Sequence, residues 1–472
     1  MSTPGAPDDP ADEGAQDGAA TRPVLERRLG LRDAVVLGLG SMVGAGIFAA
    51  VVPAAATAGR WLPLAVLVAG VVAWLNATSS ARLAAVLPQA GGTYAYATRL
   101  LGRRRGHLAG WAFVVGKTAS VAAMAYTVGS YAAPRHARWA ALAAVVLVTV
   151  LGTGGIRRGA RLTRVTLALA AVALGLVVVA SWVFPPTAPP SGLTAIVVDV
   201  GNGRWWTQLH FRLHAWEYSP FRHDGTVGPY AVLQASGLMF FAFAGYARIA
   251  TLGEEVRDPR RTIPRAIGVA LAITVALYLL VVLSVQHAAA ATGLSAAVID
   301  HTEAVAGVPG SWAPLVVRVG AVAASTGALL GLLLGVSRVL FAMARDGHLP
   351  WRFTHVRHGV PDHAERAVAA VVLVVVLFAD LRHVIGFSST TVLTYYAITH
   401  LAAWRLGRDE GRPPRLLLLA GIVGCVVLAL TLPLLSVVAG AAVLAVGVVA
   451  GAVTSRRPVS AAAVPRVSPP AA

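Results

Sequence analysis

Apolar blocks of roughly 20 residues, separated by short polar segments, run along the chain from residue 33 to residue 453. Blocks of that length are typical of helices that cross a hydrocarbon core about 30 Å thick. The pattern therefore predicts an all-α, polytopic membrane protein with twelve transmembrane helices. We place these spans at residues 33–57, 62–86, 107–132, 139–156, 163–184, 230–253, 265–287, 313–342, 366–380, 384–404, 415–432 and 434–453.

Composition excludes a soluble protein and a nucleic-acid binder. Soluble proteins carry about 25% charged residues, whereas this chain has 13% charged and 57% hydrophobic residues. The net charge of +18 comes from short arginine clusters between the apolar blocks. These clusters lack the interleaved aromatic residues that single-stranded nucleic acid requires. We therefore expect membrane lipid, and no nucleic acid, as a partner.

The arginine clusters also predict the topology, because cytoplasmic loops retain basic residues. With an even number of spans and a cytoplasmic N-terminus, every cluster lies on the cytoplasmic side of the cell membrane. A membrane domain at 31–454 is then flanked by two cytoplasmic tails. The first, 1–30, is acidic and rich in Pro, Gly and Ala, which predicts disorder; the second is 455–472. A long external loop at 185–229 is predicted to be an interfacial lid, and the loop after the second span an amphipathic helix.

The sequence gives little indication of a disulfide, a metal site or an enzymatic active site. Cys425 is the single cysteine, which excludes an intramolecular disulfide. No pair of histidines has an obvious metal-ligand spacing, so we predict no metal and no cofactor. The predicted helix interiors contain almost no acids or histidines, which argues against a membrane-embedded enzyme.

The first span contains the stretch "GLGSMVGAGIF", in which Gly38, Gly40, Gly44 and Gly46 lie within nine residues. A dinucleotide-binding loop is excluded, because the third glycine of that motif would fall at Val43. Two interpretations remain. Gly40 and Gly44 fit the small-residue motif of helix packing, and the cluster also fits a break in a membrane helix of a transporter with inverted repeats.

A second break is expected in the corresponding span of the other half. The sixth span, "GLMFFAFAGYARIATLGEE", carries Gly245 at mid-depth, five spans after the first. An odd number of spans per repeat inverts the second copy, so the two broken helices run antiparallel and meet near the midplane. Irregular backbone at that depth must be buried in protein or line a cavity.

Two facing breaks would bind a zwitterion through the backbone. Amide groups at the start of a half-helix attract an anion, and here they belong to Gly44, Ala45 and Gly46. Freed carbonyls attract a cation, and here they belong to Ser41 and Met42 in the first span and lie near Phe241 and Ala244 in the sixth. A carboxylate and an ammonium group held this close describe an amino acid.

"GSMVGAGIF", "FFAFAGYARIATLGEEVRDPRRTIPRAI" and "SRVLFAMARDGHLP" resemble the amino acid–polyamine–organocation superfamily of secondary transporters. The resemblance implies a five-plus-five inverted repeat, at 33–184 and 230–404, and two extra helices at 415–453. It also implies alternating access to a central amino acid site. It assigns substrate contacts to Met42, Gly44, Ala45, Gly46, Phe241, Ala244 and Gly245, with Phe241 as the aromatic gate.

Coupling and gating residues follow less directly. In several relatives a lysine of the fifth span fills the sodium position, but the fifth span here has none. Lys117, the only lysine, falls near the middle of the third span, where a charge is costly. It either snorkels or faces the central cavity as a proton-coupling residue. Ser325 and Thr326 are candidate sodium ligands, or they bond their own helix backbone.

The remaining charges near the sixth span are candidates for an inner gate. They are Arg248, Glu254, Glu255, Arg257 and Asp258, and Arg345 and Asp346 have the same interpretation. Arg248 stands where many relatives have a neutral or acidic residue. Close to the site it should repel cationic side chains unless Glu254 or Glu255 neutralises it, which favours a neutral or acidic substrate. The predicted function is secondary active transport of amino acids or related amines, proton-coupled or by exchange. The alternatives are an amino acid sensor with little flux and a polyamine or cationic amino acid permease.

Overall fold

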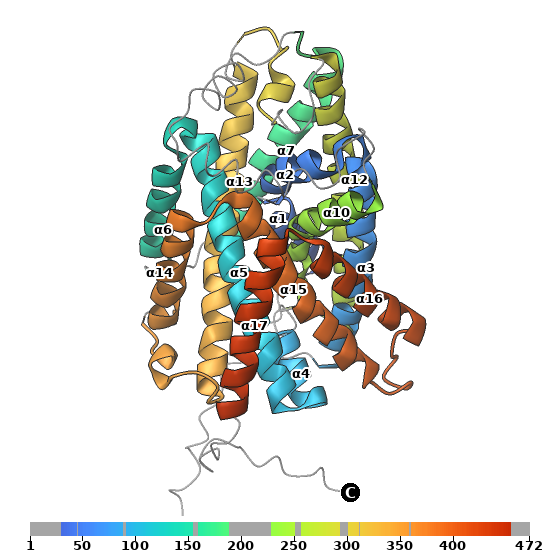
Figure 1. The fold of residues 1–472 in the computed structure, drawn as a ribbon, viewed down its shortest axis with the longest axis vertical. Helices are drawn as coiled ribbons and strands as arrows, with labels where there is room; N and C mark the ends of the chain where they lie inside the picture. Colours follow the sequence, from blue (N-terminus) through green and yellow to red (C-terminus); the bar gives the residue numbers. More distant parts are fainter. Residues whose placement is uncertain are drawn as a thin grey trace, which may run out of the picture.

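The structure is a computed structural model in which all the described regular elements are helices (Figure 1). It describes residues 30–44, 46–87, 91–153, 159–187, 228–250, 256–292, 301–310, 312–357 and 360–454. Ala45, Glu254, Glu255, the two tails and most of the long loop predicted at 185–229 lie outside the described residues.

The helices follow the predicted spans closely. Their bounds are α1 Leu31–Met42, α2 Gly46–Ala58, α3 Leu62–Val86, α4 Thr93–Leu101, α5 Arg103–Ala132, α6 Ala137–Thr153, α7 Gly159–Val183, α10 Pro229–Phe243, α11 Ala247–Ala250, α12 Pro259–Ala291, α13 Trp312–Arg345, α14 Asp362–Phe378, α15 Leu381–Trp404, α16 Arg415–Thr431 and α17 Leu434–Thr454. The short α4 is the amphipathic helix predicted after the second span.

Eight helical stretches among the described residues are long and apolar enough to cross a membrane. One of them, Gly46–Val86, contains both α2 and α3. At 1.5 Å per residue its 41 residues correspond to about 60 Å, twice the thickness of a hydrocarbon core. The molecule is therefore a multi-pass membrane protein.

The predicted span at 384–404, which corresponds to α15, carries a weaker apolar signal for a physical reason. α15 is a central helix, and many of its polar side chains are buried. The His400 ring nitrogens lie 2.8 Å from the Ser79 hydroxyl and 2.8 Å from the Asn76 carbonyl oxygen, both on α3. Such hydrogen bonds between membrane helices stabilise their packing, so α15 does not need a uniformly apolar sequence.

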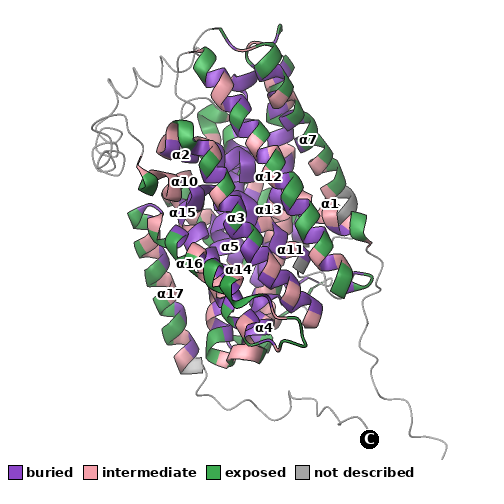
Figure 2. Ribbon diagram, turned by 90° about the vertical axis from the view of Figure 1, so that its right-hand side faces the viewer, coloured by how far each residue is buried: buried purple, intermediate pink, exposed green. Residues whose placement is uncertain are grey.

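Burial separates central from peripheral helices (Figure 2). In α5, 78% of the apolar window is buried inside the protein, against 22% in α17. A central helix can therefore carry polar or charged side chains without exposing them to lipid. This arrangement matters for Lys117, which lies on α5.

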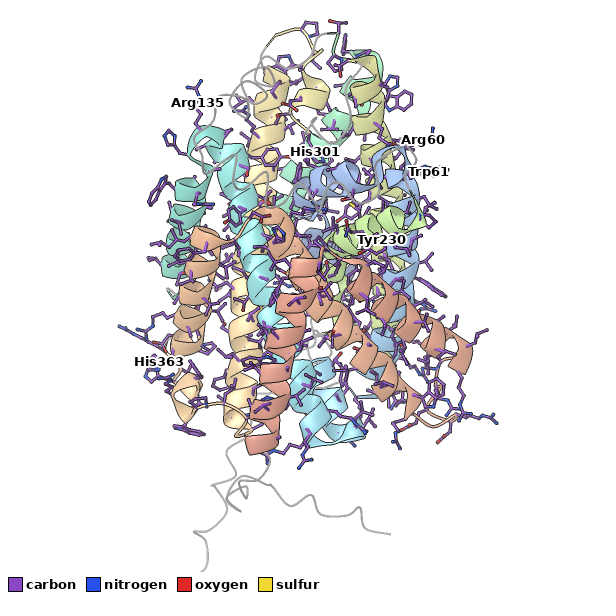
Figure 3. The ribbon with its side chains drawn as sticks, viewed as in Figure 1. Arg60, Trp61, Arg135, Tyr230, His301 and His363 are labelled. Carbon is purple, nitrogen blue, oxygen red and sulfur yellow. The ribbon has the colours of Figure 1, made fainter. Side chains whose placement is uncertain are left out.

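The two ends of the molecule separate the loops as the topology predicts. Arg60, Arg135 and His301, in loops predicted to be external, lie toward one end (Figure 3). His363, in a loop predicted to be cytoplasmic, lies toward the opposite end. That second end also holds α4 and the C-terminal end of α17 (Figure 1).

Candidate functional site

The first span is interrupted at the glycine cluster. α1 ends at Met42, Val43 and Gly44 form a turn, and α2 begins at Gly46. The sixth span is interrupted too: α10 ends at Phe243, and a single 3₁₀ turn, η3 (Ala244–Tyr246), precedes α11. Both breaks fall where the sequence predicts them.

The half-helices pair in antiparallel order. α2 packs on α10, whereas α1 packs on η3 and α11. The two breaks therefore face each other. At the contact, Gly245 lies directly against the backbone of Ser41 and Met42.

Tyr278 of α12 joins the two breaks. Its hydroxyl lies 2.7 Å from the Met42 carbonyl oxygen and 3.1 Å from the Ala242 carbonyl oxygen. The single hydroxyl proton is shared between these two acceptors, and the side chain is fully buried. The sequence analysis missed this residue, because a lone tyrosine in an apolar span carries no recognisable signal.

Lys117 reaches the second break from α5. Its Nζ donates a hydrogen bond of 3.1 Å to the Ala244 carbonyl oxygen, the first residue of η3. The side chain is only 5% exposed, so the snorkelling interpretation does not fit. An amine and a backbone carbonyl at the helix break are thus paired in the protein interior.

The glycines of the first span are also helix-packing points. A Cβ atom on Gly46 would overlap Cα of Ala242 on α10, and one on Gly44 would press against Ala328 of α13. A Cβ on Gly40 would come within 2.6 Å of the Thr163 side chain on α7. Packing and breaking, which the sequence leaves as alternatives, therefore occur together.

The other predicted site residues are distributed around this centre. Phe241 is buried on α10, one turn before η3. Ser325 is buried on α13, and its hydroxyl has no hydrogen-bond partner among the described residues. The carbonyl of the neighbouring Ala324 faces Gly44. Thr326 is half-buried on the same helix.

Of the inner-gate candidates, Arg248 lies against Gly331 of α13. Asp258 precedes α12 with φ 45°, and its carboxylate lies 4.0 Å from Arg261 in an exposed pair. An exposed pair of this kind contributes little stability. Glu254 and Glu255 lie outside the described residues, so an inner-gate role for this cluster stays a prediction.

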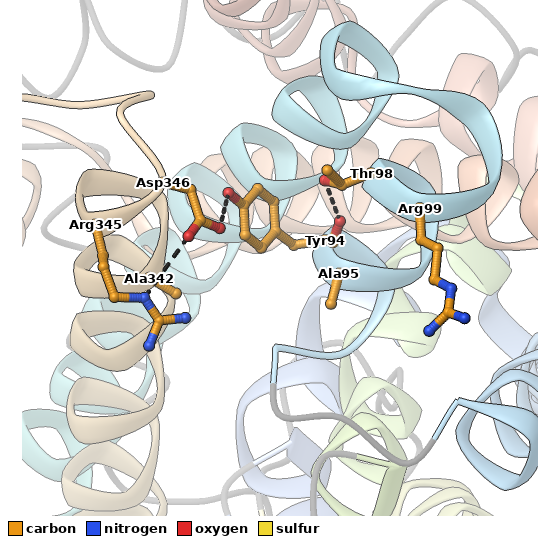
Figure 4. A pocket seen from close by; sticks show the side chains of 7 residues that line it. All are labelled: Tyr94, Ala95, Thr98, Arg99, Ala342, Arg345 and Asp346. Carbon is orange, nitrogen blue, oxygen red and sulfur yellow. Dashed lines mark hydrogen bonds and ion pairs between the residues drawn. The ribbon is translucent and has the colours of Figure 1, made fainter. Parts of the chain in front are cut away.

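A pocket of about 260 Å³ lies between α4 and α13 (Figure 4). α4 lies toward the end that holds the predicted cytoplasmic loops (Figure 1). Tyr94 donates a hydrogen bond of 2.7 Å to the Asp346 carboxylate across it. Arg103 donates to the Asp346 carbonyl oxygen at 3.2 Å. Burial and then the neighbouring Asp346 raise the pKa of the Tyr94 hydroxyl, so the hydroxyl remains a donor at physiological pH.

Toward the other end, an aromatic cluster covers the first break. Phe48 of α2 packs edge-on against Tyr131, with ring centroids 5.8 Å apart, and its centroid is 5.1 Å from that of His301. The Tyr131 hydroxyl lies 3.1 Å from Nδ1 of His301. Side-chain contacts thus lie on both sides of the facing breaks.

Comparison with known proteins gives a consistent result. A family model described as amino acid permease matches residues 33–407. An uncharacterized transporter of Mycobacterium tuberculosis is 53% identical over 90% of this chain and 91% of its own length. The branched-chain amino acid permease BcaP of Bacillus subtilis is 27% identical, with 71% of each chain covered. The vacuolar cationic amino acid transporter 4 of Arabidopsis thaliana is 28% identical over 79% of this chain and 62% of its own. With facing helix breaks at the predicted positions and a family match over most of its length, this chain belongs to the amino acid permease family of the amino acid–polyamine–organocation superfamily.

Proposed function

We propose that the protein is a proton-coupled secondary transporter that moves a neutral or acidic amino acid across the cell membrane by alternating access. In this proposal twelve spans form a five-plus-five inverted repeat with two extra helices, and both termini are cytoplasmic. The observation that carries the proposal is the hydrogen bond from Lys117 to Ala244 at the break of the sixth span.

The substrate binds between the two breaks. Its carboxylate accepts hydrogen bonds from the amides of Gly44, Ala45 and Gly46 at the start of α2, where the helix dipole favours an anion. Its ammonium group takes carbonyl oxygens near Met42, Phe241 and Ala244. Two of these candidate acceptors, Met42 and Ala244, are engaged by Tyr278 and Lys117. Substrate binding therefore displaces or re-aims these donors.

Lys117 couples this exchange to protons. When the amine is protonated it is held by the Ala244 carbonyl, and loss of the proton weakens that bond and frees the acceptor for substrate. An amine can bind and release a proton, whereas a guanidinium group cannot. A sodium ion at Ser325 and Thr326 is the competing arrangement, supported by the unpartnered Ser325 hydroxyl.

Purified protein tests the proposal in two steps. A thermal-shift screen of amino acids and polyamines identifies ligands, because a ligand that binds only the folded state raises the melting temperature. Uptake of the best ligand into proteoliposomes, with and without an inward proton gradient, then measures transport. Ligand binding without uptake under any gradient would contradict transport and favour the function of an amino acid sensor.

We expect neutral or acidic amino acids to compete for uptake and arginine, lysine and putrescine to compete weakly. Arg248 lies three residues after Gly245, which is part of the second break. Its side chain therefore places a positive charge beside the site. A cationic side chain in the substrate would meet like-charge repulsion there. Inhibition of radiolabelled uptake by a panel of unlabelled competitors measures this preference. Strong inhibition by arginine or putrescine, with none by neutral amino acids, would contradict it and favour the cationic alternative.

Tyr94→Phe is expected to open the pocket between α4 and α13. It removes a hydrogen bond to a carboxylate, and such bonds contribute about 1.5 kcal/mol or more, which corresponds to about a tenfold change in an equilibrium. A cysteine placed at Ala342, on the pocket wall, should react faster with a membrane-impermeant maleimide in inside-out vesicles. Tyr230→Phe, at an exposed tyrosine on α10, is the control. An unchanged labelling rate in Tyr94→Phe means that this contact is not part of the inner gate.

A further inference from the structure

A cluster of two histidines and an aspartate lies at the corner between η5 (Trp351–Thr354) and the first turn of α14. One nitrogen of His355, one nitrogen of His363 and one carboxylate oxygen of Asp362 lie within 4.8 Å of one another. It is the one group of three such ligands found among the described residues. From this geometry we propose that His355, Asp362 and His363 form a binding site for a divalent transition-metal ion of the Zn²⁺ type.

The ligands are already oriented by neighbouring groups. Nδ1 of His363 lies 2.9 Å from the Arg352 carbonyl oxygen, which can only accept, so the ring donates there and its lone pair is on Nε2. Metal-binding histidines are usually fixed in this way, by a hydrogen bond from the other ring nitrogen. The tautomer of His363 is thus the one that binds a metal.

The two carboxylate oxygens of Asp362 contact different side chains. Arg366 holds Oδ2 of Asp362 at 2.5 Å, whereas Oδ1 faces Nδ1 of His355 at 2.6 Å. The Asp362 side chain is buried, whereas the His355 side chain is 54% exposed. A metal ion therefore has a fixed oxygen ligand, a mobile imidazole ligand and access from solvent.

Only small movements are needed to bind an ion. Zinc–nitrogen and zinc–oxygen bonds of about 2.0–2.1 Å place neighbouring ligand atoms of a tetrahedral site about 3.3 Å apart. The two imidazole rings now stack with centroids 4.4 Å apart, and rotation of the exposed His355 ring lets both lone pairs converge. Water completes the coordination, because the exposed His355 side chain gives solvent access to the ion.

The ligand set also determines which ions bind. Imidazole nitrogen with one carboxylate suits Zn²⁺, Ni²⁺ and Cu²⁺, whereas Mg²⁺ and Ca²⁺ prefer sites made of oxygen. The site joins the residue that follows η5 to the first turn of α14, so an ion stabilises this corner of the protein.

Isothermal titration of the full-length protein in detergent with ZnCl₂, and separately with MgCl₂, tests the site. In the titration the wild-type protein should bind one Zn²⁺ and no Mg²⁺. In a separate melting experiment Zn²⁺ should raise its melting temperature, and Mg²⁺ should leave it unchanged. His363→Ala and the double variant His355→Ala/His363→Ala should weaken Zn²⁺ binding about tenfold or more. Both keep Asp362 and its bond to Arg366. A melting curve without zinc verifies that each variant is folded, at a temperature somewhat below that of the wild type because the hydrogen bonds of the replaced imidazoles are lost.

His136→Ala, at an exposed histidine of the loop between α5 and α6, is the matched control and should bind Zn²⁺ like the wild type. Wild-type affinity in the double variant, or a wild-type protein that does not bind Zn²⁺, would overturn the proposal. The result is independent of transport, because none of these residues belongs to the proposed substrate or coupling site.

Discussion

Lys117→Ala is expected to abolish uptake against a concentration gradient when a pH gradient is the only driving force. One pH unit provides 1.36 kcal/mol per proton, enough for about tenfold accumulation at a one-to-one stoichiometry. Without the amine the break of the sixth span loses the group that we propose to carry the proton, so the variant should equilibrate substrate to about the external concentration. Substrate binding, measured by thermal shift, should survive.

Lys117→Arg should fail in the same assay, although it keeps the positive charge. A guanidinium group does not release its proton at physiological pH, and its planar fork does not match a single carbonyl acceptor. Thr118→Ala is the matched control, because the Thr118 hydroxyl bonds to its own helix at the Val114 carbonyl oxygen. A strict requirement for sodium, or normal pH-driven accumulation in Lys117→Ala, would contradict a coupling role for Lys117. Ser325 and Thr326 would then be the next candidates for coupling residues.

Gly46→Val is expected to eliminate uptake and also to destabilise the protein. The sequence alone suggests a purely local effect, in which a β-branched side chain blocks the carboxylate of the substrate. In the structure the first added carbon already overlaps the backbone of Ala242. Overpacking against a well-packed interior costs about 3 kcal/mol at the upper end of the usual range, and backbone cannot move aside like a side chain.

The measurement is therefore paired: uptake in proteoliposomes, and the melting temperature of the same preparation in detergent. Gly268→Val is the control, since Gly268 is exposed on α12 and an added Cβ meets no atom within 4 Å. The control should keep both uptake and melting temperature. A Gly46→Val protein that transports with normal affinity would remove Gly46 from the substrate site.

Periodicity and glycine placement were sufficient to predict most of the fold. Apolar blocks determine the helices, and the predicted span at 62–86 coincides with α3. Both helix breaks were predictable, because glycine is unfavourable in a helix interior and a cluster of glycines needs a reason. The predicted ninth span begins at residue 366, four residues after the observed start of α14 at Asp362. The first turn of α14 is polar and therefore resembles a loop in sequence.

The contacts of the candidate site were harder to predict. Lys117 was recognisable, because a single charge at mid-depth is rare, but its partner at Ala244 is 127 residues away. Tyr278 and the cluster of His355, Asp362 and His363 were missed. A tyrosine in an apolar block looks like ordinary packing, and the two histidines, eight residues apart, are brought together only by the turn before α14.

The bridge made by Tyr278 also sets an order of events in biogenesis. Met42 and Tyr278 are separated by 236 residues, and ribosomes add about 5–20 residues per second. The first broken helix therefore waits about 12–47 s in the translocation machinery or the bilayer before the residue that binds its freed carbonyl is synthesised. During that interval an unpaired backbone group in hydrocarbon is costly. A nascent chain arrested before α12 should consequently be held by the insertion machinery or degraded, whereas one arrested after α12 should be released into the membrane.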